Sequence, residues 1–222
     1  MNRNQSDIAY EFLRNKLIRR ELPSGTRVRY GPLGDQIGMS ATPVREAIGR
    51  LASEGLVDLI PQAGAVVKRL SRTDTIEVFE MREAIEPYAA AKAAQLIGLH
   101  QLKLLQKSLD RISVLLDESS PTPLDDRQAR EFDEADLEFH LTILRATENN
   151  RMLKIVSDYH VLTAIIGIQR HAYSCDVIQT TIEDHTAIFH ALQSRDSHAA
   201  QDAMLTHIRN SRQLTLSGMS EA

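Results

Sequence analysis

Apolar residues recur at helical spacing along most of the chain. In the first third, Ala9, Leu13 and Leu17 lie four residues apart and predict a helix that Ser6 can cap and that runs to about Glu21. The stretch "LPSG" then ends this helix, because proline and glycine interrupt helical hydrogen bonding.

Two more helices and a hairpin are predicted in the same third of the chain. The second helix spans about residues 32–37 and ends at Gly38, and the third begins at Ser40. The stretch "DLIPQAGAVV", residues 58–67, predicts two short strands joined by a turn that runs from proline to glycine. Three helices with a brief turn between the last two, followed by a small hairpin, are typical of a winged helix-turn-helix.

Beyond Thr73 the pattern predicts helices alone. A long helix over residues 73–97 is interrupted or kinked near Pro87, and "ESSPTPLDD" is typical of a flexible loop. The other helices are expected over about residues 101–117, 126–147, 151–172, 176–193 and 197–216. Short connections indicate an antiparallel bundle of six to seven helices, so the expected fold class is mainly all-α, with a β-hairpin wing near the N-terminus.

The charge distribution supports two domains with different partners. We expect a winged helix-turn-helix at residues 1–70, a linker at 71–75 and a helical domain at 76–222. The 222 residues carry a net charge of -4, but residues 1–72 hold 12 Lys/Arg against 7 Asp/Glu, a charge of +5, and the remainder holds 14 against 23, a charge of -9. This asymmetry indicates that the first domain meets a polyanion.

Composition excludes several other classes of protein. Cys175 is the single cysteine, which rules out an internal disulfide and a thiolate metal cluster. Apolar runs are far shorter than the roughly 18 residues of a membrane span, and the first residues lack the apolar centre of a secretory signal. We therefore expect a cytoplasmic protein with no membrane partner.

Arg45 is the candidate residue for contact with nucleic acid. It lies off the apolar stripe of the third predicted helix and near the start of that helix, where an arginine can reach a phosphate or a base edge. A solvated surface arginine explains the same position equally well. The stripe itself consists of Val44, Ile48 and Leu51.

The stretch "MSATPVREAIGRLASEGLVDLIPQAGAVV" resembles the DNA-binding domain of the GntR family of bacterial transcription regulators, over about Ile8 to Val67. The resemblance implies that Arg45 contacts DNA, that Ser40 and Thr42 lie at the phosphate backbone, and that Gly64 lies at the tip of the wing. It also implies a homodimer on a palindromic double-stranded operator, because two recognition helices related by a two-fold axis need half-sites related in the same way.

Two positions depart from this family pattern. Ala41 stands where an arginine commonly follows the serine, and Gly31 stands where a charged residue is frequent. Loss of a base-reading arginine forfeits about 1–3 kcal/mol of discrimination. The operator is therefore expected to differ from those of related proteins, or to be bound more weakly.

Four ionisable residues are predicted to meet inside the helical domain. Asp136 and His140 are four residues apart on one helix, and His185 and His207 both share a face with apolar residues. These two histidines are equidistant from Asp196, in the turn between their helices, and residues equidistant from the turn of an antiparallel hairpin lie level.

Buried polar groups need partners, and two arrangements satisfy these four residues. One divalent cation can bind them all; nitrogen and carboxylate ligands suit Zn²⁺, Ni²⁺, Mn²⁺ or Fe²⁺. Alternatively, Asp136 pairs with His140 and His185 pairs with His207. Spacing alone does not choose between a metal site and two hydrogen-bonded pairs.

The stretches "MREAIEPYAAAKAA", "DLEFH" and "EDHTAIFHAL" resemble the FCD effector domain of the FadR subfamily of these regulators. The resemblance implies a metal bound by Asp136, His140, His185 and His207, and a small organic acid effector held by Arg82. Arg82 shares a stripe with apolar residues, so it is expected to point inward, where Glu86 one turn away is the alternative partner. Asn150 is a further candidate for contact with the effector, although a helix cap explains it equally well.

The expected function is therefore a ligand-responsive transcription regulator, a repressor by our interpretation, and not an enzyme. A metal-dependent enzyme acting on a small carboxylate is the alternative, but the sequence shows no extra inward-facing Glu or Asp to serve as a general base. A regulator with a purely structural metal is the other alternative.

Overall fold

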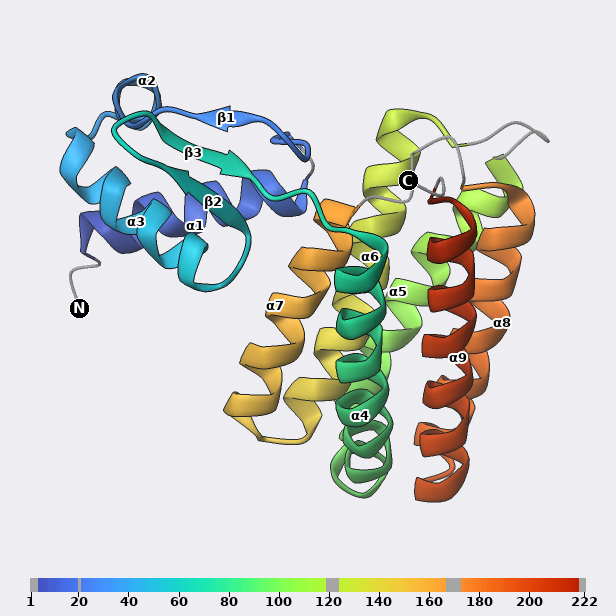
Figure 1. The fold of residues 1–222 in the computed structure, drawn as a ribbon. Coiled ribbons are helices and arrows are strands. Elements are labelled where there is room, and N and C mark those ends of the chain that lie inside the picture. The colour runs from blue at the N-terminus through green and yellow to red at the C-terminus, as the bar shows by residue number, and fades with distance from the viewer. Residues whose placement is uncertain (1–3, 20, 119–123, 167–172, 220–222) are drawn as a thin grey trace. The chain divides into compact units, whose positions relative to one another are not determined.

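The computed structural model describes residues 4–19, 21–118, 124–166 and 173–219, in which the chain forms two compact units (Figure 1). The first unit comprises the chain up to Ser71, together with Val161–Ile166. The second unit comprises the remaining helical residues.

Three helices and three short strands make up the described N-terminal part of the first unit. They are α1 (Gln5–Ile18), β1 (Arg27–Val28), α2 (Tyr30–Ile37), α3 (Ala41–Ser53), β2 (Val57–Ile60) and β3 (Gly64–Val67). The apolar stripes of α1 and α3 are buried against each other, as Leu13 and Ile48 show. Helix α2 ends at Gly38, which adopts the left-handed conformation. The predicted winged helix-turn-helix is confirmed.

The start and end of α1 differ from the prediction. The helix begins at Gln5 with Asn4 at the N-cap position, and it ends at Ile18 instead of about Glu21. Ser6 lies inside the first turn and is buried, because it belongs to the face that packs on the core. The predicted cap at Ser6 is therefore wrong.

A three-stranded antiparallel sheet in the order β1-β3-β2 completes the first unit. The predicted hairpin is formed by β2 and β3, with Leu59 opposite Ala65. Strand β1 pairs with β3 through Arg27 opposite Val66. The sequence analysis missed β1, since a strand of two residues has no periodicity to detect.

Six helices form the described part of the second unit. They are α4 (Arg72–Leu96), α5 (Leu99–Glu118), α6 (Asp126–Ala146), α7 (Asn150–Ile166, whose end is grouped with the first unit), α8 (Cys175–Gln193) and α9 (Ser197–Ser217). All six were predicted, and α4 continues through Pro87 without interruption. Residues 167–172 of the predicted helix 151–172, and residues 119–123 of the predicted loop, lie outside the described residues.

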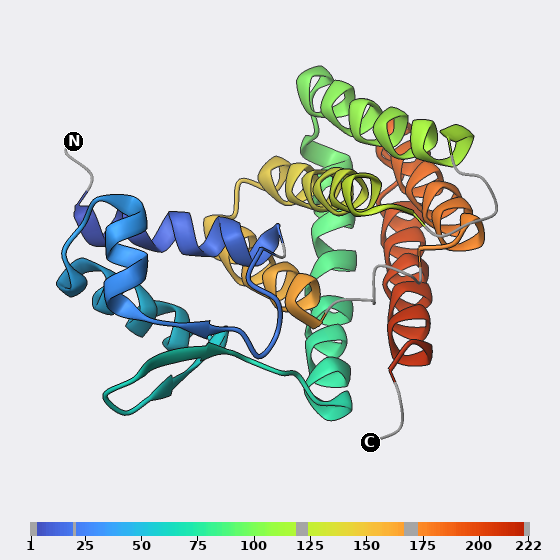
Figure 2. The same cartoon turned by 90° about the horizontal axis from the view of Figure 1, so that it is seen from above.

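The helices of the second unit bury apolar side chains in several clusters, the largest of which is formed by α4, α5, α6, α8 and α9. Helix α4 lies beside α9, α5 beside α6, and α8 beside α9 (Figures 1 and 2). The largest fully buried core side chains include Phe79 on α4 and Phe139 on α6. The bundle therefore encloses the faces of α6, α8 and α9 that carry the predicted metal ligands.

Most of the predicted linker at residues 71–75 belongs to a helix. Helix α4 begins at Arg72, whose Nη1 donates to the Leu216 carbonyl at 3.0 Å, and Thr75 is fully buried. These contacts hold the residues after Ser71 against the second unit. Within the described helices, none has the length and apolarity needed to cross a membrane.

Candidate functional site

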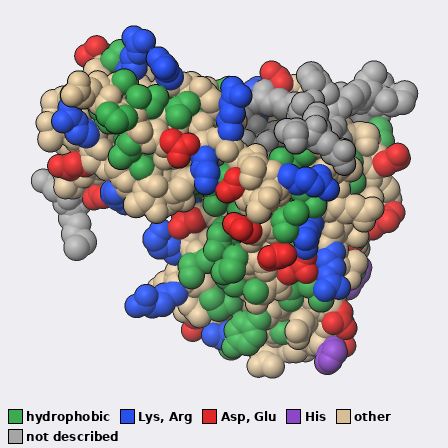
Figure 3. Space-filling model, viewed as in Figure 1, with side chains coloured by type: hydrophobic (Ala, Val, Ile, Leu, Met, Phe, Trp, Pro, Cys, Tyr) green, Lys and Arg blue, Asp and Glu red, His purple; other side chains and the backbone are tan. Residues whose placement is uncertain are grey.

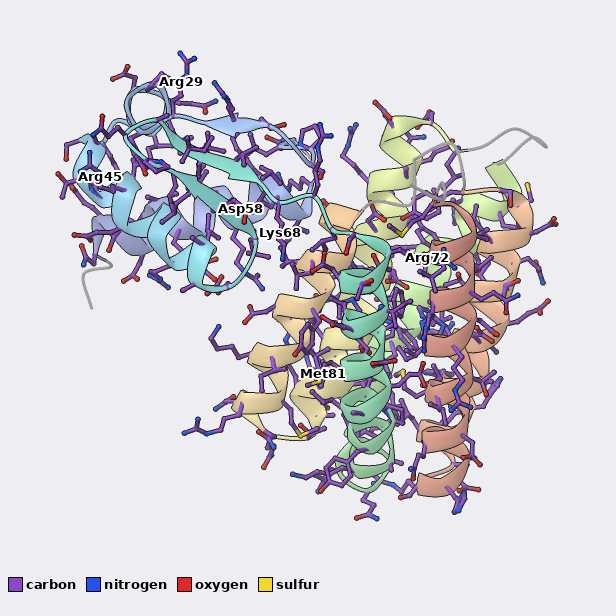
Figure 4. The ribbon with its side chains drawn as sticks, in the orientation of Figure 1. Arg29, Arg45, Asp58, Lys68, Arg72 and Met81 are labelled. Carbon is purple, nitrogen blue, oxygen red and sulfur yellow. The ribbon has the colours of Figure 1, made fainter. Side chains whose placement is uncertain are left out.

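The exposed start of α3 carries three of the predicted DNA-contact residues. Ser40 occupies the N-cap position, and Ser40, Thr42 and Arg45 all face solvent. The Ser40 side chain makes no capping hydrogen bond to the helix. Within the described ranges no carboxylate pairs with Arg45, which is labelled in Figure 4. A free cation and unused donors at a helix N-terminus suit a phosphate backbone or a base edge.

Other arginines of the first unit differ in whether the protein already neutralises them. Arg50 is held by Asp7, with 2.6 Å between Nη1 and Oδ1, and its guanidinium lies over the Tyr10 ring at 4.0 Å from the centroid. Arg27 and Arg29, by contrast, are exposed and have no carboxylate partner in the described part of the chain. Figure 3 shows a group of Lys and Arg side chains on the side of the unit that bears α2 and β1.

Gly64 lies at the base of the wing turn and not at its tip. It is buried with a φ of +106°, and a Cβ placed there would lie 2.2 Å from the Val28 carbonyl oxygen of β1. Only glycine fits this left-handed conformation and close approach. The exposed residues of the tip are Pro61, Gln62 and Ala63. The structure therefore gives Gly64 a role in shaping the wing instead of the tip position expected for DNA contact.

The four predicted metal ligands come together inside the second unit. One ligand atom from each of Asp136, His140, His185 and His207 lies within 4.8 Å of the others. The Nε2 atoms of His140 and His207 are 3.1 Å apart, and those of His185 and His207 are 3.3 Å apart. Asp136 Oδ1 lies 3.5 Å from His185 Nε2. The four side chains thus form one cluster and not two separate pairs.

Three helices and one aromatic ring position this cluster. Helix α6 places Asp136 and His140 one turn apart on its inward face, and the α8–α9 hairpin places His185 and His207 level with each other. Phe139 stacks on the His185 ring with centroids 4.0 Å apart, which fixes the plane of that imidazole. The three histidines are almost completely buried, whereas Asp136 is partly exposed.

Carboxylates behind two of the rings favour lone pairs on the nitrogens that face the centre. His140 Nδ1 lies 2.6 Å from Glu86 Oε2, and His207 Nδ1 lies 3.4 Å from Asp184 Oδ2. A carboxylate beside Nδ1 favours the tautomer with the proton on Nδ1, which leaves Nε2 as an acceptor. Two acceptors that face each other at 3.1 Å repel unless a cation or a proton lies between them.

Burial disfavours protonation of His185 and His207, so a proton on either ring is not the favoured way to relieve the repulsion between facing lone pairs. Removal from water lowers the pKa of His185 well below 6.5, and His207 and His140 lower it further. Burial also lowers the pKa of His207, although Asp184 opposes this shift. Three imidazoles and one carboxylate, with carboxylates behind two of the rings, are the donor set of a first-row divalent metal. The residues present therefore fit a metal ion.

A second buried polar group surrounds Glu86 on α4. Glu86 Oε1 lies 2.6 Å from Arg82 Nε and 3.4 Å from His160 Nε2, and all three side chains are buried. Burial alone would raise the pKa of Glu86, but Arg82, His140 and His160 together lower it well below its ordinary value. Glu86 is therefore an ionised carboxylate that joins Arg82 to the back of His140.

Sequence reasoning found only part of this second group. It named Glu86 as a partner of Arg82 but missed the contact of Glu86 with His140, and it did not single out His160. His160 lies on α7, and a lone histidine on an amphipathic helix carries no spacing signal. Glu86, His140 and His160 are close enough to bind a cation of their own. The Arg82 guanidinium already neutralises Glu86, which makes a second metal there unfavourable.

Asn150 is not brought to the cluster. It is the exposed first residue of α7, ten residues before His160, or about 15 Å along the helix axis. Its neighbour Asn149 caps the helix, since Asn149 Oδ1 accepts from the backbone N–H groups of Arg151 and Met152 at 3.1 Å each. The start of α7 is thus explained by capping.

Comparison with known proteins identifies two families of domain in the chain. Residues 5–67 match the model of "Bacterial regulatory proteins, gntR family", and residues 77–210 match the FCD domain. A probable D-xylose utilization operon transcriptional repressor of Paenarthrobacter nicotinovorans is 28% identical over 198 residues, covering 89% of this chain and 83% of that protein.

Other relatives carry related descriptions. The HTH-type transcriptional repressor RspR of Escherichia coli is 27% identical and covers 90% of this chain and 84% of its own length. The gluconate operon transcriptional repressor of Bacillus subtilis is 26% identical, covering 85% of this chain and 75% of that protein. Among solved structures, E. coli McbR/YncC has the same fold, with a TM-score of 0.84, 19% identity, and coverage of 97% of this chain and 98% of that one.

Proposed function

Because this chain belongs to the GntR family of bacterial regulatory proteins and carries an FCD domain, we propose that it is a repressor that binds an operator through its first unit and senses a small organic acid at a metal centre in its second. Its relatives are transcriptional repressors, and regulation of transcription, not catalysis, is the activity of the family. The observation that carries the sensing part is the convergence of four ligand atoms within 4.8 Å beside a buried arginine.

In this proposal α3 is the recognition helix. Its exposed N-terminal turn enters the major groove, Arg45 reaches a base edge, and Ser40 and Thr42 bind phosphate oxygens. Arg27 and Arg29 add positive charge on the same unit, where their guanidinium groups are free to meet phosphates.

A selected duplex tests the role of Arg45. The full-length protein would be used to enrich a random duplex pool, and fluorescence anisotropy would give the dissociation constant of the enriched duplex. Arg45→Ala is expected to weaken binding by about five- to a hundredfold, because one bidentate base contact is lost. Arg50→Ala is the matched control, since Asp7 and Tyr10 already hold that guanidinium. Unchanged affinity in Arg45→Ala would remove Arg45 from the interface.

The proposed operator-binding form is a homodimer. A two-fold dimer presents two copies of α3 to a palindromic site. The second unit has an exposed apolar row on α4, where Met81 and Tyr88 lie two turns apart and expose 42% and 61% of their surface. Figure 3 shows apolar side chains grouped on the face of this unit that includes α4, and Figure 4 labels Met81 there.

Light scattering after gel filtration tests the dimer. Met81→Glu with Tyr88→Glu is expected to shift the mass towards one chain, because buried unpaired carboxylates oppose association. Val114→Glu is the control, since Val114 is a comparably exposed apolar residue on α5. A dimer that persists in the double variant would place the interface elsewhere.

The proposed metal ligands are Asp136, His140, His185 and His207. A bound divalent ion of the Zn, Ni, Mn or Fe type would satisfy the facing lone pairs and offer an anionic ligand an electrostatic partner. The protein's own contribution is to hold three Nε2 atoms at the centre, which Glu86 and Asp184 achieve from behind two of the rings.

Metal content tests this centre directly. Protein purified without chelators is expected to hold about one ion per chain by elemental analysis, and His207→Ala to hold little. His198→Ala is the control, because His198 is exposed and pairs with Asp202, which is exposed too. Removal of the ion should lower the melting temperature, since a ligand that binds only the folded state stabilises it. Equal metal content in wild type and His207→Ala would contradict the assignment.

The proposed effector is a small carboxylic, hydroxy or sugar acid. Glu86 takes the Nε–H of Arg82, and the terminal nitrogens of a guanidinium carry further N–H donors that suit a carboxylate. Two relatives are named for sugar and sugar-acid operons, D-xylose and gluconate, which supports this class. Relief of repression requires that the acid bind the free protein more tightly than the DNA-bound form.

Thermal shift with acetate, lactate and gluconate distinguishes a sensor from a purely structural metal site. A sensor is expected to be stabilised by at least one of these acids in its metal-loaded form and to lose that response in Arg82→Leu. If the metal raises the melting temperature but no acid does, the metal is structural and the effector proposal fails.

A further inference from the structure

Tyr30 contacts both parts of the first unit that a winged helix-turn-helix uses to bind DNA. It is the first residue of α2 and is half-buried. The Arg45 guanidinium lies over its ring, 5.1 Å from the centroid. The Tyr30 hydroxyl donates to the carbonyl oxygen of Gly64 at 3.4 Å, and Gly64 is the first residue of β3. One side chain therefore links the recognition helix to the base of the wing.

The contact with the ring restricts a side chain that would otherwise be mobile. An exposed arginine loses much rotamer freedom when it binds, and that loss weakens the complex. A cation within about 6 Å of an aromatic centroid is attracted to the ring face. Because no carboxylate in the described residues holds Arg45, the Tyr30 ring orients the guanidinium without neutralising its charge.

Arg50 shows the contrasting arrangement on the same helix. Its guanidinium also lies over a tyrosine ring, that of Tyr10, but Asp7 binds its Nη1 at 2.6 Å. An arginine held by a carboxylate has its charge satisfied within the protein. The aromatic contact at Arg45 thus leaves the cation available to an external acceptor, whereas the contact at Arg50 does not.

We propose that Tyr30 is a positioning residue for sequence recognition, which holds the Arg45 guanidinium in the orientation that reads a guanine edge and ties this orientation to the wing. The proposal rests on the proposed function, in which Arg45 contacts a base. Guanine is the expected base, since its O6 and N7 acceptors match the two parallel donors of a guanidinium. Tyr30 itself need not touch DNA.

A double-mutant cycle on the full-length chain tests the proposal. The probes are a duplex enriched from a random pool by the wild-type protein and a scrambled duplex of the same composition. Tyr30→Leu is expected to weaken binding of the enriched duplex by about three- to thirtyfold and to leave binding of the scrambled duplex nearly unchanged. Tyr30→Phe keeps the ring and is expected to retain most of the affinity.

The Arg45→Ala background separates positioning from a general structural effect. In that background Tyr30→Leu should cause no further loss of selectivity, because the group that it positions is already absent. Equal losses in both backgrounds, or no loss in Tyr30→Leu, would overturn the role of Tyr30 and leave Arg45 in place. Unchanged selectivity in Arg45→Ala alone would instead overturn the part of the proposed function in which Arg45 reads a base.

One measurement does not depend on the folding of a variant. In the wild-type protein the side-chain protons of Arg45 should show an upfield ring-current shift in the NMR spectrum, which Tyr30→Phe keeps. Random-coil shifts for these protons in the wild type would show that the ring does not hold the guanidinium in solution, and would overturn the proposal.

Discussion

At the scale of single residues, Glu86 is the carboxylate that contacts two residues of the proposed sensing site, Arg82 and His140. Its Oε1 accepts from Arg82 at 2.6 Å, and its Oε2 lies 2.6 Å from Nδ1 of His140. A carboxylate behind a ligand histidine fixes the tautomer and strengthens the ligand. The charge of Glu86 therefore controls how well His140 presents its lone pair.

We expect Glu86→Gln to weaken metal binding by about 10–100-fold, as loss of such a carboxylate does in other metal sites. The substitution keeps the size of the side chain and removes its charge, so packing is nearly unchanged. Competition with a chromophoric chelator would give the dissociation constant of the metal. Glu83→Gln is the control on the same helix, because Glu83 pairs with Arg209 and Arg212 near the surface. Equal metal affinities in both variants would contradict the role of Glu86.

At the scale of elements, the wing depends on a single backbone position. Gly64 brings β3 so close to β1 that a Cβ would lie 2.2 Å from the Val28 carbonyl oxygen. The left-handed φ of +106° adds a second restriction. The pairing of β1 with β3 therefore needs a residue at position 64 that has no Cβ and adopts a positive φ, as glycine does.

Gly64→Ala is accordingly expected to destabilise the protein by about 2 kcal/mol or more, measured by urea unfolding. Ala63→Ser, at the exposed tip, should change stability little. A Gly64→Ala variant with wild-type stability and impaired DNA binding would instead favour direct contact of Gly64 with DNA.

Helix α6, which carries two of the four proposed ligands, begins with a capping box. Asp125 accepts from the Arg127 and Gln128 backbone N–H groups at 2.8 and 2.7 Å, and the Gln128 side chain accepts from the Asp125 N–H at 3.0 Å. We expect Asp125→Ala to lower the free energy of unfolding by about 1 kcal/mol, measured in urea on metal-free protein. A smaller loss is expected for Asp126→Ala, one residue inside the helix. Equal effects would show that the cap contributes little.

The elements also show what sequence can and cannot predict here. The spacing of Asp136 and His140, and the symmetry of His185 and His207 about a turn, are local, so the sequence was sufficient to predict each of these two pairs. Spacing left open whether the two pairs meet, because that depends on how α6 packs against the α8–α9 hairpin, and the structure brings all four together. The contact of His160 with Glu86 joins helices far apart in the chain, and no periodicity encodes it. The same holds for β1, which forms only because β3 offers it an edge.

At the scale of the whole molecule, buried neutral histidines make stability depend on pH. Burial lowers the pKa of His160 to about 4, and it lowers the pKa of His185 well below 6.5. The unfolded chain, with histidine pKa values near 6.5, binds more protons than the folded chain between these limits. Their contribution to stability is therefore fully present above about pH 6.5 and is lost as the pH falls towards 4.

For the metal-free protein we expect the free energy of unfolding, measured in urea, to fall steadily from about pH 7 to about pH 4.5, by at most about 1.4 kcal/mol per pH unit for each histidine, and the urea midpoint to fall with it. His160→Asn should reduce the slope, whereas His198→Ala should not, because His198 is exposed. A midpoint that stays constant over this range would show that these rings are protonated without unfolding.

The two ring nitrogens of His140 contact different groups, and in the proposed function this couples metal binding to effector binding. Its Nε2 faces the other proposed metal ligands, and its Nδ1 faces Glu86, the carboxylate that holds Arg82. Any acid that draws Arg82 away from Glu86 must also alter the electron density that His140 donates at its opposite nitrogen, and thermodynamic linkage makes the influence reciprocal. In the proposed function, the metal supply therefore influences the concentration of acid at which repression is relieved, and the regulator responds to metal and acid together.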